Sequence, residues 1–145
     1  MAYVANTGDS RAIMCLDGGK NFVMLSRDHK PEDPNETERI EKHGGKVYQN
    51  FSFIPDPTPG NPSGTQTLTG PHRVDPGRLS VSRTIGDIEA KDSRYGGKAD
   101  IVISTPEIRS FKITDNYDFI LMGCDGVFEK MTNQEILKTI FTSAN

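Results

Sequence analysis

The sequence predicts an α+β fold, and two observations carry this prediction. Three short apolar segments near the N-terminus are separated by turn residues, as consecutive strands are, and an amphipathic helical pattern closes the chain. No strand–helix–strand rhythm occurs between them, which argues against a parallel sheet. Consecutive strands joined by short turns favour antiparallel pairing.

The composition is that of a globular chain with a modest core. Its 145 residues suit one domain or part of one, and 34% are hydrophobic alongside 14 glycines. The net charge of −3, from 17 basic and 20 acidic residues, offers no basic field, so neither nucleic acid nor an anionic membrane is an expected partner. Without a long apolar run or a signal peptide, an intracellular location, cytoplasmic or nuclear, is expected.

The two cysteines, Cys15 and Cys124, each lie in an apolar run and are far apart in the sequence. We expect two buried free thiols in a reducing compartment, with one disulfide as the open alternative. A zinc site is not expected, because no second Cys or His stands at ligand spacing from either residue.

The first three strands are predicted at residues 2–6, 11–16 and 22–25. Residues 7–10 form a turn, and we expect the second strand to return along the first.

A helix is predicted after these strands. Asp33 can cap it, Pro34 suits its first position, and Glu36 stands where a capping box has an acid. The glycines at 44–45 end the helix, and residues 46–48 form a short strand.

Residues 49–72 differ from the rest of the chain in composition, since they hold five of its nine prolines. We expect a long surface loop or flap. Loops of this length are uncommon unless they are functional or disordered.

The second half of the chain predicts four strands and a terminal helix. Three of the strands are at residues 78–82, 101–103 and 108–113. The continuous apolar run within 118–122 indicates a central strand that is covered on both faces. Thr132 and Glu135 have the spacing of a capping box at the start of the last helix. Since a strand begins almost at once and little follows the last helix, we expect both ends to lie within a longer domain.

Asp125 directly follows the predicted central strand, and Gly126 allows a close approach of backbone or ligand. Glu129 lies on the same face if the chain turns helical there. Two carboxylates this close repel each other unless they are protonated or bridged by a cation, and oxygen ligands suit Mg²⁺ or Mn²⁺. The open alternative is that Asp125 only caps a short helix.

Three further candidates lie in turns. Asp9 is either a third carboxylate at the same edge or an ordinary turn residue. Arg83 holds a phosphate or forms a structural ion pair. His29 is a general base only if a nucleophile faces it, so we interpret it as a turn residue and assign no catalytic residue.

Taken together and in order, six segments resemble consecutive blocks of one family, the 2C-type (PPM) metal-dependent serine/threonine protein phosphatases. These segments are residues 4–11, 25–31, 38–47, 79–87, 106–108 and 119–129. The resemblance implies that residues 1–145 are the C-terminal part of a catalytic domain whose fold is an αββα β-sandwich, two antiparallel sheets flanked by helices, incomplete here at both ends. It also implies that 49–72 is the variable flap beside the active site.

The resemblance further implies hydrolysis of phosphoserine and phosphothreonine in proteins by water that two metal ions activate, with Mg²⁺ or Mn²⁺ as the cofactor. Asp125 matches a metal ligand of the family. Asp9 matches the aspartate of an additional, weaker metal, and Glu129 stands where the family usually has an aspartate for that metal.

Several of the family's blocks are absent from the chain. They include the phosphate-binding arginine, the Asp-Gly-His segment and the late Asp-Asn block. We therefore expect no turnover from this chain alone, and the alternative is a truncated, non-catalytic scaffold or binding module. The expected partners are a phosphoprotein substrate and, through open sheet edges, the missing N-terminal part of the domain or a second copy.

Overall fold

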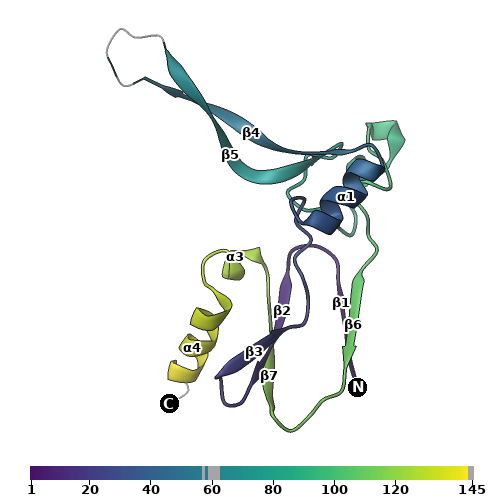
Figure 1. The fold of residues 1–145 in the computed structure, drawn as a ribbon. Coiled ribbons are helices and arrows are strands. Elements are labelled where there is room, and N and C mark those ends of the chain that lie inside the picture. Colours follow the sequence, from purple (N-terminus) through teal and green to yellow (C-terminus); the bar gives the residue numbers. More distant parts are fainter. Residues whose placement is uncertain (57, 59–62, 144–145) are drawn as a thin grey trace. The chain divides into compact units, whose positions relative to one another are not determined.

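The computed structural model describes residues 1–56, 58 and 63–143. They form two compact units, one of Met1–His29 with Ser104–Asn145 and the other of Lys30–Ile103. All four pairs of neighbouring strands are antiparallel, and the helices are few and short (Figure 1). The predicted α+β class is therefore confirmed.

The first unit contains two sheets. A two-stranded sheet pairs β1 (Ala2–Asn6) with β6 (Glu107–Phe111), and a three-stranded sheet has the order β3 (Asn21–Met24), β2 (Arg11–Leu16) and β7 (Tyr117–Gly123). The expected hairpin of the first two strands is wrong, because the turn between them carries the chain from one sheet to the other. The continuous apolar sequence of β2 explains this, since a strand of that kind needs cover on both faces.

Strand β2 is the covered strand of this unit. The residues on one face pack against the two-stranded sheet (Ala12, Met14 and Leu16, with Val4 and Phe111). The residues on the other face pack against helix α4, Asn133–Ser143 (Ile13 and Cys15, with Ile136 and Leu137). The unit is thus layered as sheet, sheet and helix, and Figure 1 shows α4 alongside the three-stranded sheet.

The expectation that residues 118–122 form the central strand is wrong for the described residues, in which β7 pairs only with β2. Ile120 and Met122 pair with Met14 and Ala12, so they point to the side of the two-stranded sheet. They nevertheless stay 47% and 76% exposed, because that sheet has only two strands in the described residues and does not cover β7.

The capping box that begins α4 is confirmed. The backbone N–H of Thr132 donates to Oε2 of Glu135 over 2.8 Å, and the backbone N–H of Glu135 donates to Oγ1 of Thr132 over 3.3 Å. The backbone N–H of Thr132 and its hydroxyl both donate to the Glu135 carboxylate over 2.8 Å, and these two bonds lower the pKa of Glu135.

The second unit contains the helix α1 (Pro34–Lys42) and the hairpin of β4 (Lys46–Pro55) and β5 (Gly64–Asp75). Two short helices follow, α2 (Ile88–Lys91) and η1 (Ser93–Tyr95). Its core consists of fully buried aliphatic side chains from α1, β5 and the loop after η1 (Ile40, Val74, Ile101 and Val102). The predicted cap of α1 is confirmed, because the side chain of Asp33 accepts bonds from the backbone N–H groups of Asn35 and Glu36.

The predicted strands at 78–82 and 101–103 are wrong. These segments run through loops whose only strand-like contact among the described residues is one isolated bridge between Arg83 and Ile103. The apolar side chains of Ile101 and Val102 enter the core of the unit, so core burial rather than sheet pairing explains their sequence.

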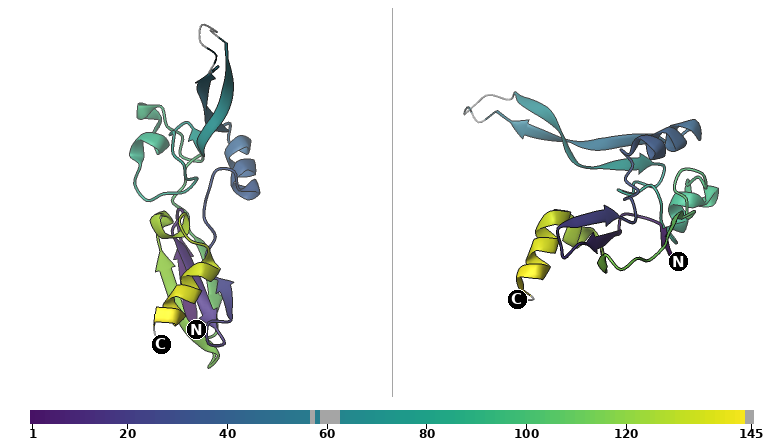
Figure 2. Two further views of the ribbon diagram at one scale, coloured as in Figure 1. Left: turned by 90° about the vertical axis from the view of Figure 1, so that its left-hand side faces the viewer. Right: turned by 60° about the horizontal axis from the view of Figure 1, so that its bottom comes forward.

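The described residues of 49–72, where we expected a long surface loop or flap, form most of the β4–β5 hairpin instead, and Figure 2 shows its two long strands. Proline and glycine counts hid the alternation of apolar and polar residues at Phe51-Ser52-Phe53 and the β-branched residues Thr65, Thr67 and Thr69. Pro57, Pro59 and Pro62 lie outside the described residues. A flap role for the segment stays a prediction.

Both cysteines are free thiols. Cys15 is buried in the core between β2 and α4, as expected, whereas Cys124 is exposed. The expectation of burial is wrong for Cys124 because this residue follows the end of β7, where the chain leaves the sheet for the next helix.

A buried carboxylate, Glu36, ties α1 to the loop at residues 82–83. It accepts hydrogen bonds from Ser82 Oγ over 2.6 Å, Arg83 Nη2 over 2.5 Å and Arg39 Nη2 over 2.9 Å. Burial alone would raise the pKa of Glu36, but these donors outweigh it and lower the pKa from 4.5 to about 2. The capping-box role expected for Glu36 is therefore wrong. Of the two interpretations of Arg83, the structural ion pair is the one that the structure shows.

Replacing Glu36 by Gln is expected to destabilise the protein at pH 7, because three donors lose a charged acceptor. The folded-state pKa of Glu36 lies below its ordinary value, so its contribution is present above pH 4.5 and is lost as the pH falls towards 2. A shift of this size corresponds to about 3 kcal/mol. Urea unfolding at pH 7 and pH 3 measures the effect.

The Glu36→Gln variant should lose less stability between these two pH values than the unchanged protein does. An equal pH dependence for both would contradict the role of Glu36. The control is Glu38→Gln in the same helix, because the side chain of Glu38 is exposed.

Candidate metal centre

The turn that carries Asp9 is held in place by buried and partly buried hydrogen bonds. The Asn6 side chain donates to the carbonyl oxygens of Gly8 over 3.1 Å and Arg27 over 2.9 Å. His29 donates its backbone N–H to the Gly8 carbonyl over 3.0 Å, and its Nδ1 accepts from the Gly8 N–H over 3.2 Å. Gly8 has φ 108°, a conformation that favours glycine. Asp9 is therefore presented by a rigid turn.

The His29 ring lies between this turn and β6. Its side chain is 1% exposed, and its Nε2 is 3.7 Å from Oε2 of Glu107. Because both ring nitrogens face protein groups, His29 braces the turn. This agrees with its interpretation as a turn residue.

Strand pairing brings Asp9 and Asp125 to the same end of the three-stranded sheet. Arg11 and Gly123 form the last pair between β2 and β7 at this end, and each aspartate lies two residues beyond that pair. Asp9 is partly exposed and Asp125 is exposed. Both residues thus lie at one edge of the sheet.

Asp125 begins the short helix α3, Asp125–Phe128, and Cys124 occupies the cap position. The alternative that Asp125 is the helix cap is therefore wrong. Its Oδ1 accepts a bond from the Gly126 N–H over 2.8 Å. The backbone N–H of Glu129 donates to the Asp125 carbonyl over 2.8 Å, so Glu129 follows one helical turn later, as expected.

The guanidinium of Arg11 connects the elements around this end of the sheet. It donates to both carboxylate oxygens of Asp28, over 3.0 and 2.8 Å, and to the side-chain oxygen of Asn133 over 3.0 Å. Its Cζ is also 4.6 Å from the centre of the Phe128 ring. The hydrogen bond to Asp28 raises the pKa of Arg11, so the charge is permanent. One side chain thereby holds β2, α3 and the start of α4 together.

The sequence reasoning missed this role of Arg11. An arginine at the start of a buried strand carries a signal that could have found it, since such a charge is almost always paired. Asp28 and Asn133 carried no comparable signal, because acceptors of this kind are also common in turns and at helix starts.

The carboxylates do not form a complete metal site by themselves. Among the residues described, no group of three or more His, Cys, Asp or Glu side chains is placed to hold a metal ion. The structure brings Asp9 and Asp125 to one edge and places Glu129 one turn further on, without gathering all three. Their oxygen donors suit a hard divalent cation, but their number is below the six or more ligands that such a cation takes.

Comparisons with known proteins agree with this fold. The family described as "Protein phosphatase 2C" matches residues 1–145. The chain belongs to the protein phosphatase 2C family. It is 37% identical over 139 residues to "Protein phosphatase 2C 1" of Paramecium tetraurelia, covering 95% of this chain and 38% of that protein.

Solved structures of related proteins have the same fold. A phosphatase from a pathogenic strain of Toxoplasma gondii is 31% identical, with a TM-score of 0.70, covering 97% of this chain and 36% of that one. A C. elegans sex-determining protein aligns with a TM-score of 0.73 at 22% identity, covering 99% and 28%, and this likeness concerns the fold alone. The expected fold class is confirmed, and the chain corresponds to part of the 2C fold.

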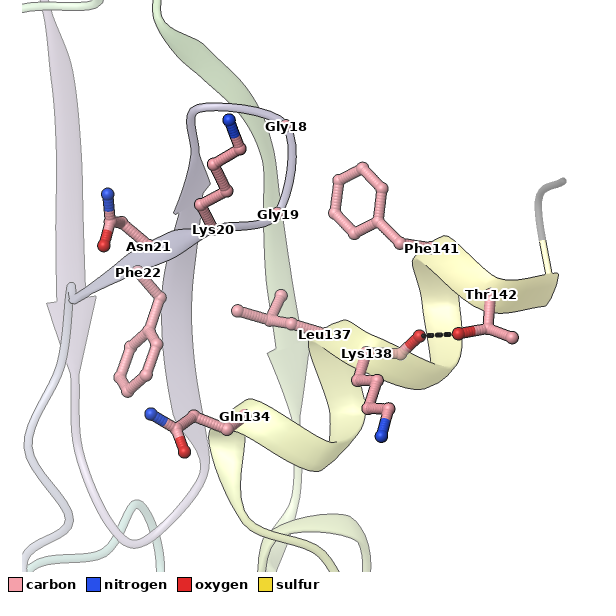
Figure 3. Close-up of a pocket in the computed structure, with 10 residues that line it drawn as sticks. All are labelled: Gly18, Gly19, Lys20, Asn21, Phe22, Gln134, Leu137, Lys138, Phe141 and Thr142. Carbon is pink, nitrogen blue, oxygen red and sulfur yellow. Dashed lines mark hydrogen bonds between the residues drawn. The ribbon is translucent and has the colours of Figure 1, made fainter.

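A hollow of about 690 Å³ lies between the β2–β3 turn and α4 (Figure 3). The ring of Phe141 points to this turn, and a side chain on Gly19 would collide with it at 2.3 Å. The turn is at the opposite end of β2 from Arg11, and the lining contains no carboxylate. The hollow is therefore separate from the candidate metal centre of this 2C-family chain.

In the described part of the chain, no helix combines the length and the apolar character that crossing a bilayer requires.

Replacing Arg11 by Lys is expected to destabilise the protein by about 1–3 kcal/mol. Lysine keeps the positive charge but loses the two-pronged contact with Asp28 and the stacking on Phe128. Equilibrium unfolding in urea measures the change.

The matched control is Arg109→Lys, since Arg109 also pairs with a carboxylate but its side chain is 44% exposed. It should lose less than about 1 kcal/mol. Equal losses in both variants would contradict a special role for Arg11.

Proposed function

We propose that the chain is part of a metal-dependent protein serine/threonine phosphatase, a hydrolase that takes phosphoproteins as substrates. We propose Asp125 as a ligand of Mg²⁺ or Mn²⁺, and Asp9 and Glu129 as ligands of an additional cation. Family membership supports the activity, and the β2–β7 register supports the site because it presents Asp9 and Asp125 at one edge.

The proposed ligands differ in how firmly they are held. Asp125 follows β7 without an intervening loop and starts a helix whose Phe128 stacks under Arg11. Asp9 lies on the turn braced by His29. Glu129 follows α3 as its C-cap and is one methylene longer than an aspartate, so it has more freedom in where its carboxylate reaches.

When bound, the divalent cation supplies an activated water for attack on phosphorus and offsets charge on the phosphoryl oxygens. The contribution of this chain is to hold carboxylate oxygens at the edge of a rigid sheet. Preorganised ligands of this kind cost little rearrangement during the reaction.

We propose that this chain alone has no turnover. The described carboxylates are too few for a closed set of ligands, and a cation held by one or two of them exchanges readily with water. The remaining ligands would come from a longer protein, since the chain spans only 38% of the length of the Paramecium relative. We also propose that the N-terminal part of such a longer protein is a partner of this chain and completes the domain.

An intracellular location, cytoplasmic or nuclear, belongs to the same proposal. Two free thiols, one of them exposed, favour a reducing compartment.

The metal site is tested by Mn²⁺ binding to the isolated chain, followed by electron paramagnetic resonance of free Mn²⁺. We expect weak binding, and a loss of at least about threefold in affinity when Asp125 becomes Asn, because one of few carboxylate ligands is removed. Asp115→Asn is the matched control, since Asp115 lies in the turn before β7, at the other end of that strand. Equal losses in both variants would indicate general attraction of cations to an acidic surface.

The activity is tested by phosphate release from a phosphothreonine peptide in the presence of Mn²⁺. The isolated chain should release none, whereas a protein extended to the full length of its relatives should do so and lose the activity in Asp125→Ala. Turnover by the isolated chain that Asp125→Ala abolishes would contradict the inactivity. An inactive extended protein would favour the scaffold or binding module.

A further inference from the structure

The Arg11 side chain makes three kinds of contact at one end of the three-stranded sheet. Its guanidinium donates to both carboxylate oxygens of Asp28, over 3.0 and 2.8 Å, and to Oδ1 of Asn133 over 3.0 Å. It also lies over the Phe128 ring, with Cζ 4.6 Å from the ring centre. One planar group therefore contacts a carboxylate, an amide oxygen and an aromatic face at the same time.

The contact with Phe128 reaches the helix that carries a proposed metal ligand. Helix α3 is a single turn, Asp125–Phe128, and the Phe128 ring is 9% exposed in the core that also contains Ile13. A helix this short does not hold its own direction, because helical structure in short segments depends on packing against the rest of the protein. The position of the Phe128 ring, in the core and against Arg11, therefore determines how α3 continues from β7.

The bond to Asn133 extends this support to Glu129. Helix α4 begins at Asn133, so the residues between Phe128 and Asn133 are bounded on both sides by a contact with Arg11, and Glu129 is the first of them. The backbone N–H of Glu129 also donates to the Asp125 carbonyl over 2.8 Å. We therefore expect Asp125 and Glu129 to move together when the contacts of Arg11 change.

The charge of Arg11 does not explain its place beside a proposed cation site, since a positive charge there repels the ion. Asp28 offsets this charge within a pair whose side chains are 22% and 18% exposed. Lysine would carry the same charge, but it lacks the planar fork that contacts a carboxylate and an aromatic ring together. The shape of the guanidinium, rather than its charge, is therefore the property that this position uses.

We propose that Arg11 is a positioning residue of the candidate metal centre. Held by Asp28, it sets the direction of α3 and thereby the places at which Asp125 and Glu129 present their carboxylates. The inference rests on the proposed function, because it concerns the same metal ligands. Arg11 acts through these ligands and does not touch the ion, as partners behind the ligands of a metal commonly do.

The test is the Mn²⁺ affinity of the folded chain, followed by electron paramagnetic resonance of free Mn²⁺. Arg11→Lys keeps the charge and should weaken binding by at least about twofold, since partners that orient a ligand typically change metal affinity by that much or more. In a chain that already carries Asp125→Asn, Arg11→Lys should cause no further loss, because two changes that act through one ligand are not additive.

The matched control is Arg94→Lys. Arg94 also donates to both carboxylate oxygens of an aspartate, Asp92, and lies 5.9 Å from the centre of the Tyr95 ring, but it is 78% exposed and belongs to the second unit. It should leave the Mn²⁺ affinity unchanged. Circular dichroism at the temperature of the titration checks that each variant is folded, and Phe128→Leu, which removes the ring beside Arg11, serves if Arg11→Lys does not fold.

A purely structural Arg11 would lower the stability of the chain and leave the Mn²⁺ affinity of the folded molecules unchanged, which would overturn the inference. Equal losses from Arg11→Lys with and without Asp125→Asn would overturn it as well, because the effect would not pass through that ligand. If Asp125→Asn alone weakens binding and Arg11→Lys does not, only this inference fails. If Asp125→Asn leaves the affinity unchanged, the proposed metal site is wrong and the inference falls with it.

Discussion

The burial of β2 on both faces is the constraint on which the rest of the first unit depends. One face of the strand packs against the two-stranded sheet and the other packs against α4. One short apolar segment therefore fixes the positions of two layers. Its pairing with β7 then decides where Asp125 lies relative to Asp9. Hydrophobic burial therefore determines the position of polar groups that take no part in the core.

Features governed by neighbouring residues could be predicted from the sequence. The caps at Asp33 and at Thr132 with Glu135 are local hydrogen bonds between residues two to three positions apart, and both were confirmed. Most strands were also predicted, because their apolar runs are bounded by turn residues. Helix ends and strand cores of this kind need no knowledge of the distant chain.

Pairing partners and shared contacts could not be predicted in the same way. The same criterion of a continuous apolar run applied to both β2 and β7, and only the sheet order shows which is covered. The edge shared by Asp9 and Asp125 was expected from spacing and resemblance, whereas the links from Arg11 to Asp28 and Asn133 depend on segments up to 122 residues apart. Long-range contacts such as these leave little trace in a single sequence.

The burial of Glu36 has a consequence for how the second unit responds to salt. Its side chain is 2% exposed, so dissolved ions do not reach the contacts with Arg39 and Arg83 as they reach the surface pair of Arg94 with Asp92. Concentrated salt should therefore weaken the surface pair and leave the join between α1 and residues 82–83 intact. The contact between α1 and residues 82–83 therefore depends on pH, through the protonation of Glu36, but only weakly on salt.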